Sequence, residues 1–292
     1  MPHKAGFVNI IGKPNVGKST LMNALIGEKL CIITPKAQTT RHRILGIVNA
    51  DDYQVVFSDT PGIIEPHYKL QETMMREVAG AFEDADILLY IVEVGEQAVD
   101  NELTQKIKSQ GHSLIVAINK VDLSEQAFVE TKLKAWQEIF PEADIIPVSA
   151  LHGMNIQSVL HKIQDKLPEN PPYYEKDTLT DRSERFFVAE MIREKILLNY
   201  QKEIPYSVEI AVDQFKDKGD LIHIIAYIFV ARESQKAIII GHEGKAIKKV
   251  GTQARIDLEE WLGKKIFLEL SVKVIKDWRD SEKELRKFGY DV

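Results

Sequence analysis

A glycine-rich loop near the amino terminus carries the residue types that bind nucleotide phosphates. Residues 12–19 read GKPNVGKS and fit the pattern G-x-x-x-x-G-K-[ST]. An apolar run at 7–11 precedes the loop and a helical pattern at 19–26 follows it, so backbone N–H groups and a helix N-terminus are expected to converge on one anion. The residues predicted to contact the phosphates are Gly12, Asn15, Val16, Gly17, Lys18, Ser19 and Thr20.

Oxygen atoms suited to a magnesium ion occur in this loop and in a second segment. Lys18 is expected to reach the β- and γ-phosphates, and Ser19 to ligate Mg²⁺ beside them. The sequence DTPG follows another apolar run. Its carboxylate, Asp59, is expected to hold the Mg²⁺ shell, and the N–H of Gly62 to contact the γ-phosphate.

The segment 33–43 is long for a plain connection between a helix and a strand. We predict that it is a switch segment, with Thr40 ligating Mg²⁺ only while the γ-phosphate is present and with Thr39 as the alternative. A structural connection without function is the competing interpretation.

Two later motifs indicate that the base bound at this nucleotide site is guanine. In the sequence NKVD, the carboxylate of Asp122 can accept from both N1–H and N2–H of guanine, whereas adenine has a lone pair at the corresponding ring nitrogen. Asn119 is expected to tie this loop to the phosphate loop, and the stem of Lys120 to cover the base. Ser149 and Ala150 end the last apolar run, and the Ala150 N–H is expected to donate to guanine O6.

Hydrolysis needs a group that orients water, and the usual one is missing. Many GTPases carry a glutamine directly after the glycine of DTPG, but here Ile63 occupies that position. We therefore expect slow intrinsic hydrolysis or a different device. Asn15 is the candidate ligand for a potassium ion, since related enzymes without the glutamine hold a monovalent cation there; a loop-stabilising side chain is the alternative.

The elements that must position these motifs alternate along the first part of the chain. Apolar runs predict strands at 7–11, 44–49, 54–59, 87–93, 114–119 and 144–149, and helical patterns predict helices at 19–26, 69–82, 102–109, 128–139 and 156–167. This alternation predicts an α/β domain with an open, mostly parallel sheet and helices on both faces. The motifs all follow predicted strands, at the sheet edge where such folds bind ligands.

A different pattern begins after a proline-rich stretch. We predict a nucleotide-binding domain at 1–170, a linker at 171–182 and a smaller α+β domain at 183–292. The second part has the order α-β-β-α-α-β, with helices at 184–198 and 246–262. Clean alternation predicts its last strand at 266–274.

The second part contains a G-x-x-G loop between two helices. KH domains clamp about four nucleotides of single-stranded RNA with such a loop. Three lysines at i, i+3 and i+4 share a helix face beside it. The residues predicted to contact RNA are Gly241, His242, Glu243, Gly244, Lys245, Lys248 and Lys249. A helix–turn–helix with a solvated lysine face is the competing interpretation.

Composition limits the class of protein. The chain has 292 residues, 44% of them hydrophobic, one cysteine and a net charge of −6. This argues against a basic whole-surface nucleic-acid binder and excludes an intrachain disulfide. We expect a cytoplasmic protein without a secretory signal or membrane-spanning run.

Taken together, these motifs resemble the Era family of bacterial ribosome-associated GTPases. The resemblance covers nearly the whole chain and rests on GKPNVGKST, KAQTTRHR, DTPG, NKVD, SAL and the IIGHEGKAIKKVG segment. It implies an Era/TrmE-type P-loop GTPase domain and a type II KH domain. It also implies the ligands GTP, GDP and Mg²⁺, the 3′ region of 16S ribosomal RNA and the small ribosomal subunit as partners, and a role in subunit maturation. A monomer with a peripheral inner-membrane fraction is expected. Glu243 departs from the family pattern, because an acid stands between the two glycines where RNA phosphate should approach.

Three functions remain as alternatives at this point. The first is a GTP-hydrolysing switch that changes RNA binding. The second is an RNA-binding assembly factor in which nucleotide is mainly structural. The third, an ATPase or kinase, conflicts with Asp122.

Overall fold

The computed structural model describes residues 2–292 and divides the chain into two units. The first comprises the chain up to Glu65 and Met74–Asp181, and the second comprises Pro66–Thr73 and Arg182–Val292.

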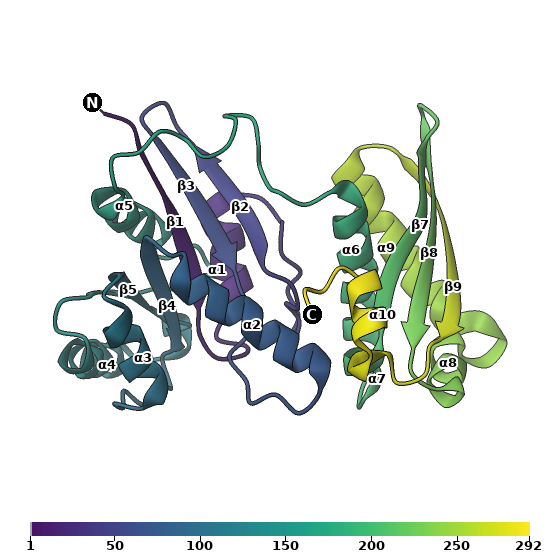
Figure 1. Cartoon of the computed structure of the whole chain (residues 1–292), viewed down its shortest axis with the longest axis horizontal. Helices are drawn as coiled ribbons and strands as arrows, with labels where there is room; N and C mark the ends of the chain where they lie inside the picture. Colours follow the sequence, from purple (N-terminus) through teal and green to yellow (C-terminus); the bar gives the residue numbers. More distant parts are fainter. Residues whose placement is uncertain (1) are drawn as a thin grey trace. The chain divides into compact units, whose positions relative to one another are not determined.

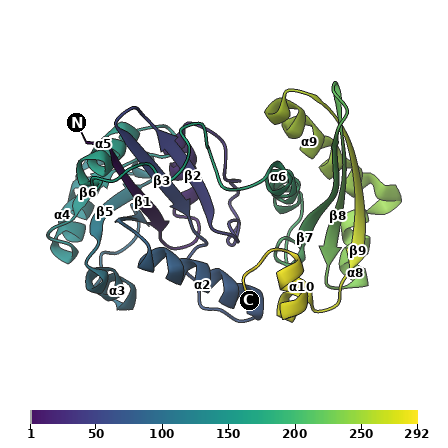
Figure 2. The ribbon, with the colours of Figure 1, turned by 45° about the horizontal axis from the view of Figure 1, so that its top comes forward.

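The first unit is built on a six-stranded sheet with the order β2-β3-β1-β4-β5-β6 (Figures 1 and 2). All neighbouring strands are parallel except β2, which is antiparallel to β3. The predicted open, mostly parallel sheet is therefore confirmed. The strands are β1 Lys4–Ile11, β2 Ile44–Asn49, β3 Tyr53–Asp59, β4 Ile87–Glu93, β5 Ser113–Asn119 and β6 Asp144–Pro147.

Helices cover both faces of this sheet. One face packs α2, α3 and α4 on a buried cluster that includes Phe82, Tyr90, Ile107 and Trp136. Helices α1 and α5 contact each other on the opposite face (Figures 1 and 2). The helices are α1 Lys18–Ile26, α2 Lys69–Glu83, α3 Glu102–Gln110, α4 Gln126–Ile139 and α5 Ile156–Lys166, with a 3-10 turn at Val121–Leu123. The first residues of α2, up to Thr73, are grouped with the second unit.

The segment predicted as a linker, 171–182, is for the most part held against the first unit. The side chain of Gln54 accepts from the N–H groups of Tyr173 and Tyr174. The N–H of Ile47, on the edge strand β2, donates to the carbonyl of Leu179 at 2.8 Å. The prolines rule out regular structure there, but they do not prevent extended backbone from pairing with an open sheet edge. The structure consequently draws the boundary between the units at residues 181 and 182.

The second unit has a three-stranded sheet with the order β7-β8-β9, in which β7 and β8 are antiparallel and β8 and β9 are parallel. The expected α-β-β-α-α-β order is present, with two short helices, α7 and α10, that the sequence analysis did not predict. The elements are α6 Glu184–Asn199, α7 Ile204–Ser207, β7 Glu209–Asp217, β8 Leu221–Val230, α8 Glu233–Ile240, α9 Lys245–Leu262, β9 Lys265–Val274 and α10 Glu282–Lys287.

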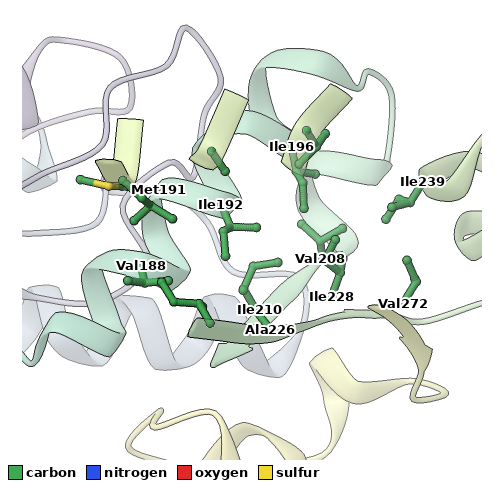
Figure 3. Close-up of a cluster of buried hydrophobic side chains, with 14 of the residues drawn as sticks. Val188, Met191, Ile192, Ile196, Val208, Ile210, Ala226, Ile228, Ile239 and Val272 are labelled. Atoms are coloured by element: carbon green, nitrogen blue, oxygen red, sulfur yellow. The ribbon is translucent and has the colours of Figure 1, made fainter. Parts of the chain in front are cut away.

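One face of that sheet and three helices enclose the core of the second unit (Figure 3). Ile192 and Ile196 come from α6, Ile239 comes from α8, and Val208 lies just before β7. These side chains are fully buried. Full burial of an aliphatic side chain contributes roughly 1.5–3 kcal/mol relative to exposure, so this unit has its own source of stability.

Candidate nucleotide-binding and RNA-binding sites

The loop between β1 and α1 has the open backbone that phosphate binding needs. Gly12, Asn15 and Gly17 all have positive φ values, of 154°, 62° and 100°. A Cβ atom at Gly17 would lie 2.2 Å from Nδ2 of Asn119, so no side chain fits there. Gly17 also precedes the first turn of α1, and no side chain caps that helix end. The first N–H groups of the helix are therefore suited to an anion.

Lys18 is buried at the centre of this loop. Its Nζ atom donates to the carbonyls of Gly12, at 3.1 Å, and Lys13, at 2.8 Å. Burial lowers the pKa of Lys18 to about 8, although the charge of Asp59 opposes the shift. A phosphate beside Nζ would supply the negative charge that favours the protonated form.

Three oxygen-bearing side chains from three segments converge on one point. Ser19 Oγ donates to Asp59 Oδ2 at 2.7 Å, and Thr40 Oγ1 donates to the same oxygen at 3.1 Å. The two hydroxyls are 3.0 Å apart. Thr39 instead bonds Thr34 and the carbonyl of Lys36. Of the two predicted threonines, Thr40 is thus the one whose hydroxyl meets Ser19 and Asp59.

This cluster fits a magnesium ion. Asp59 is fully buried, and burial raises its pKa against the opposing effects of Ser19, Lys18 and Thr40. Within residues 2–292, its Oδ1 atom has no hydrogen-bond partner. A buried carboxylate oxygen without a partner, beside two hydroxyls, matches the hard oxygen ligands that Mg²⁺ prefers.

The turn after β3 lies directly against the phosphate loop. A Cβ atom at Gly62 would be 2.8 Å from the Cα of Pro14, and the N–H of Ile63 donates to the carbonyl of Gly12 at 3.1 Å. The side chain of Ile63 packs against the buried cluster under α2, α3 and α4. An aliphatic side chain packed in this way has no group with which to orient water.

The predicted guanine motifs meet at the ends of β5 and β6. Asn119 donates from Nδ2 to the carbonyl of Val16 at 2.8 Å, so it ties this loop to the phosphate loop as expected. The side chain of Asp122 is 22% exposed, and its Oδ2 lies 3.7 Å from Nε2 of His152. Lys120 pairs with Glu93 at 2.9 Å.

Ala150 makes a contact that the sequence analysis did not predict. Its N–H donates to Oδ1 of Asn119 at 3.0 Å, so donation to guanine O6 would require a second acceptor on the same N–H. That assignment stays a prediction. Ser149 is buried, and among the described residues its Oγ has no hydrogen-bond partner.

One cavity of about 420 Å³ connects the phosphate end with the base end. This volume lies within the usual range for small-molecule sites. Its lining includes Lys18, Ser19, Thr40 and Asp122. The lining also contains Leu123 and Leu151, which are 71% and 76% exposed. The sequence analysis missed their side chains, whose apolar surface is available to the face of a base.

The switch segment forms part of the same cavity. Residues 32–36 and 38–40 belong to its lining. Nδ2 of Asn15 donates to the carbonyl of Pro35 at 3.2 Å. Asn15 therefore contacts the switch segment, which is the loop-stabilising role left open as the alternative to a cation ligand.

The G-x-x-G loop of the second unit joins α8 to α9 through a 3-10 turn. Gly241 and Gly244 have φ values of 69° and 72°. A Cβ atom at Gly241 would lie 2.6 Å from Cβ of Ala246, whereas the space at Gly244 is open. Glu243 pairs with Lys245 at 2.8 Å, so the acid that interrupts the loop is neutralised by a neighbouring cation.

A hollow of about 260 Å³ lies beside the loop, between α9 and β9. Lys248 is part of its lining, but Lys249 is not. Two other polar residues in it, Thr252 and Arg255, were not predicted. They follow Lys248 at i+4 and i+7, and this helical spacing could have identified them.

Comparisons with known proteins agree with these two sites. Residues 7–120 match the family model described as 50S ribosome-binding GTPase, and residues 203–279 match the KH domain model. The fold and the site therefore define a P-loop GTPase with a carboxy-terminal KH domain.

Full-length relatives narrow this class to one family. The chain is 48% identical to GTPase Era of Syntrophus aciditrophicus over 99% of this chain and 95% of that protein. It is 44% identical to GTPase Era of Caldanaerobacter subterraneus over 100% and 99% of the two chains. The chain belongs to the Era family, and it is a GTPase.

Solved structures of this family have the same fold throughout. A variant of Era from Aquifex aeolicus bound to GDP and AlF4− superposes with a TM-score of 0.95 at 39% identity, covering 99% of this chain and 100% of that one. Era in complex with MgGDPNP and nucleotides 1506–1542 of 16S ribosomal RNA gives the same TM-score, identity and coverage. No helix between residues 2 and 292 has the length and apolar character to span a bilayer.

Proposed function

We propose that this GTPase is a switch that binds the 3′ region of 16S ribosomal RNA and assists maturation of the small ribosomal subunit. The observation that carries the proposal is the contact of Thr40 with Ser19 and Asp59. It joins the switch segment to the phosphate loop at the point where Mg²⁺ and the γ-phosphate would lie. Mg²⁺ and the γ-phosphate would add ligand bonds to these side-chain contacts, and loss of the γ-phosphate would leave the switch segment freer to move.

The residues of the first unit would have separate roles in GTP binding and hydrolysis. Ser19, Thr40 and Asp59 would hold Mg²⁺, which neutralises charge on the β- and γ-phosphates when bound. Lys18 and the N–H groups at the start of α1 would stabilise the charge that develops in the transition state. Asp122 would select guanine. Slow intrinsic hydrolysis is expected because Ile63 contributes apolar packing instead of a water-positioning amide.

The second unit would supply the RNA contacts. The residues proposed are Gly241, His242, Glu243, Gly244, Lys245, Lys248 and Lys249, with Thr252 and Arg255 added from the hollow beside them. The relative solved with 16S ribosomal RNA supports this partner. We further propose a cytoplasmic monomer that acts on the small subunit, with a fraction held peripherally at the membrane.

The main alternative is an RNA-binding assembly factor in which nucleotide only stabilises the fold. The partnerless Oδ1 of Asp59 is the observation that fits this alternative, since a bound Mg²⁺ would satisfy the buried oxygen and stabilise the fold. RNA affinity that depends on the nucleotide state separates the two functions.

Crosslinking to cellular RNA tests the proposed partner. We expect crosslinks to concentrate in the 3′ region of 16S ribosomal RNA and to be lost in Gly244→Asp. Aspartate tolerates a positive φ and meets open space there, so the variant should fold while placing a negative charge where phosphate approaches. Gly244→Asn is the matched neutral control and should keep most crosslinks. Equal crosslinking of the Asp and Asn variants would contradict the proposed site.

Replacing Lys245, Lys248 and Lys249 with alanine should weaken RNA binding and flatten its salt dependence. Each lost phosphate contact should reduce the log–log salt slope by about 0.7 for single-stranded RNA. Because Lys249 lies outside the hollow, it should contribute less than Lys248. Fluorescence anisotropy at several salt concentrations measures the slope.

Glu243→Gln is a control that should change RNA affinity in the opposite direction. It removes the acid that pairs with Lys245, so RNA affinity should rise. GTP hydrolysis without RNA should be unchanged in every one of these variants. An unaltered salt slope in the triple variant would place the RNA surface elsewhere.

Potassium should accelerate GTP hydrolysis more than sodium, through a cation held by Asn15. Hydrolysis builds charge on the γ-phosphate and its bridging oxygen, and a monovalent cation could stabilise that charge without an arginine finger. Asn15 lines the nucleotide cavity, so it is placed for this role. Hydrolysis rates in matched potassium and sodium buffers measure the effect.

Two substitutions separate a cation ligand from a loop-stabilising side chain. Asn15→Ala should abolish the potassium preference, whereas Asn15→Asp keeps a side-chain oxygen and tolerates the positive φ, so the preference should remain. Equal rates of the wild type in the two buffers would reject the potassium ligand.

A further inference from the structure

The sheet of the second unit has two apolar faces, and the helices cover one of them. Even-numbered residues of β8, from Ile222 to Val230, belong to the core beneath the helices. Odd-numbered residues of the same strand point to the opposite face, because side chains alternate along a strand. Four of these are apolar or aromatic and one is a histidine: Leu221, His223, Ile225, Tyr227 and Phe229. We call this the outer sheet face.

Strand register places one lysine, Lys216, in the same row as two aromatic rings on this face. Direct neighbours across the strands form the rows Lys216–His223–Phe267, Gln214–Ile225–Glu269 and Ala211–Tyr227–Ser271. Consecutive rows are two residues apart along each strand, or about 7 Å. Side chains within a row are close enough to act on one ligand.

The carboxy-terminal segment covers one end of the outer sheet face. Phe288 packs on Phe229 with ring centroids 5.1 Å apart, and the fully buried Trp278 packs on Phe288. The hydroxyl of Tyr290 bonds Glu209 on β7. These contacts cover Glu209 and Phe229, whereas Lys273, the third residue of their row, stays exposed.

The remaining rows are partly exposed. The ring of Phe267 is 50% exposed, and Lys216 in its row and Glu269 in the next row are exposed as well. Lys273 is also exposed, but it lies in the row of Phe229. Phe267 is therefore an accessible aromatic ring with one cation and one carboxylate in its own and the next row.

Two flat platforms stand on the open part of the face. His223 and Phe267 stack with centroids 4.7 Å apart and an angle of 27° between the rings. The Nζ atom of Lys273 lies 3.1 Å above the ring of Tyr227. The first platform has Lys216 in its row and keeps an accessible ring, whereas the ammonium of Lys273 covers the ring of the second.

This combination fits nucleic acid better than protein. Bases stack on aromatic side chains whatever their sequence, and neighbouring lysines bind the phosphates. Protein interfaces also favour aromatic residues, but lysine is depleted in them. Sheets that stack two or three bases are an established mode of RNA recognition.

We propose that the outer sheet face binds a single-stranded RNA segment, with one base stacked on the exposed face of Phe267, whose other face stacks on His223. Lys216 and Lys273 bind the phosphates. Glu269 lies in the row between the platforms and accepts from an exocyclic amino group, which favours cytosine or adenine over uracil there. This surface is distinct from the G-x-x-G loop and the hollow between α9 and β9, which lie on the helical side.

Alanine substitution in the full chain tests the proposal with labelled oligocytidylate as the probe. Phe267→Ala should weaken binding of an oligonucleotide long enough to reach both surfaces, by between about fivefold and about a hundredfold for one lost stacking contact. A tetranucleotide, which fills only the G-x-x-G site, should bind with unchanged affinity. Phe128→Ala is the matched control, because Phe128 is 45% exposed and also has a lysine beside its ring, but it lies in the first unit.

Tryptophan fluorescence tests stacking directly. It uses variants that keep an aromatic side chain, so the result does not depend on a truncation that could unfold the protein. A tryptophan in Phe267→Trp should be quenched by the long oligonucleotide, whereas the one in Phe128→Trp should not. Weakened binding of both oligonucleotides by Gly244→Asp, with intact quenching at position 267, would show the two surfaces to be separate. Equal affinity of Phe267→Ala and Phe128→Ala for the long probe would overturn the proposal. So would self-association that is lost in Phe267→Ala, since the face would then join two copies of the chain.

Discussion

Asp122→Asn should shift the base preference of the nucleotide site from guanine to xanthine. The carboxylate lines the cavity and can accept two hydrogen bonds from guanine, whereas asparagine would present an NH₂ group to the same edge. Xanthine has an oxygen in place of the guanine amino group, so it can accept from that NH₂. Losing two bonds to a charged group costs about 3–6 kcal/mol, or between about a hundredfold and about ten-thousandfold in GTP affinity.

Calorimetric titration with GTP, XTP and ATP measures this change. Asp51→Asn, on an exposed turn of the same unit, is the control and should bind GTP as the wild type does. The assignment of Asp122 is wrong if the variant still binds GTP tightly and ignores XTP. Comparable affinity of the wild type for ATP and GTP would support the ATPase alternative.

Lys18→Met should remove most GTP turnover without unfolding the protein. Methionine keeps much of the buried stem but cannot donate to the phosphates. Removing one donor from a preorganised charged site typically lowers kcat about 10²–10³-fold. Burial already lowers the pKa of Lys18 to about 8. Keeping this ammonium protonated near neutral pH therefore lowers the folding stability of the wild type without ligand.

The sign of the stability effect follows from that pKa. Because the folded-state pKa lies below the usual value of 10.5, the unfavourable contribution is full below about pH 8 and disappears as pH rises through 8 to 10.5. Without nucleotide, Lys18→Met should therefore melt no lower than the wild type at pH 7. The increase in Tm on adding Mg²⁺ and GTP should be lost.

Lys13→Met is the matched control in the same loop. Lys13 is 51% exposed and pairs with Glu96, so its loss should leave turnover nearly intact. Turnover of Lys18→Met equal to that of Lys13→Met would reject the assignment of Lys18 to the phosphates.

The sequence predicted the elements around the nucleotide site well, because the apolar runs that form the strands end directly at the motifs that form the site. The strands at 44–49 and 87–93 were predicted to the residue. Apolar runs end where a polar motif begins, and parallel strands deliver such motifs to one sheet edge. Asp59 was placed by this principle, whereas Thr40 was chosen, with Thr39 as the alternative, because a switch segment should ligate Mg²⁺.

Contacts between segments far apart in the chain could not be predicted in this way. The extended segment around Leu179 pairs with the edge of β2 through backbone groups, and backbone hydrogen bonding has no sequence signature. The bond from the Ala150 N–H to Asn119 depends on loop geometry, and Leu123 and Leu151 looked like ordinary apolar residues. Helices α7 and α10 span only 204–207 and 282–287, too short for a periodic pattern to appear.

RNA affinity in the two nucleotide states tests the central claim most directly. Fluorescence anisotropy would use an RNA with the sequence of the 3′ end of 16S ribosomal RNA and the full chain with Mg²⁺ and either GDP or a non-hydrolysable GTP analogue. The switch predicts affinities that differ by about tenfold or more, a coupling of about 1.4 kcal/mol, and a reciprocal change in nucleotide affinity when RNA is bound. Gly244→Asp should bind weakly in both states. Equal RNA affinity of the wild type with GDP and with the GTP analogue would contradict the account and leave nucleotide with a structural role.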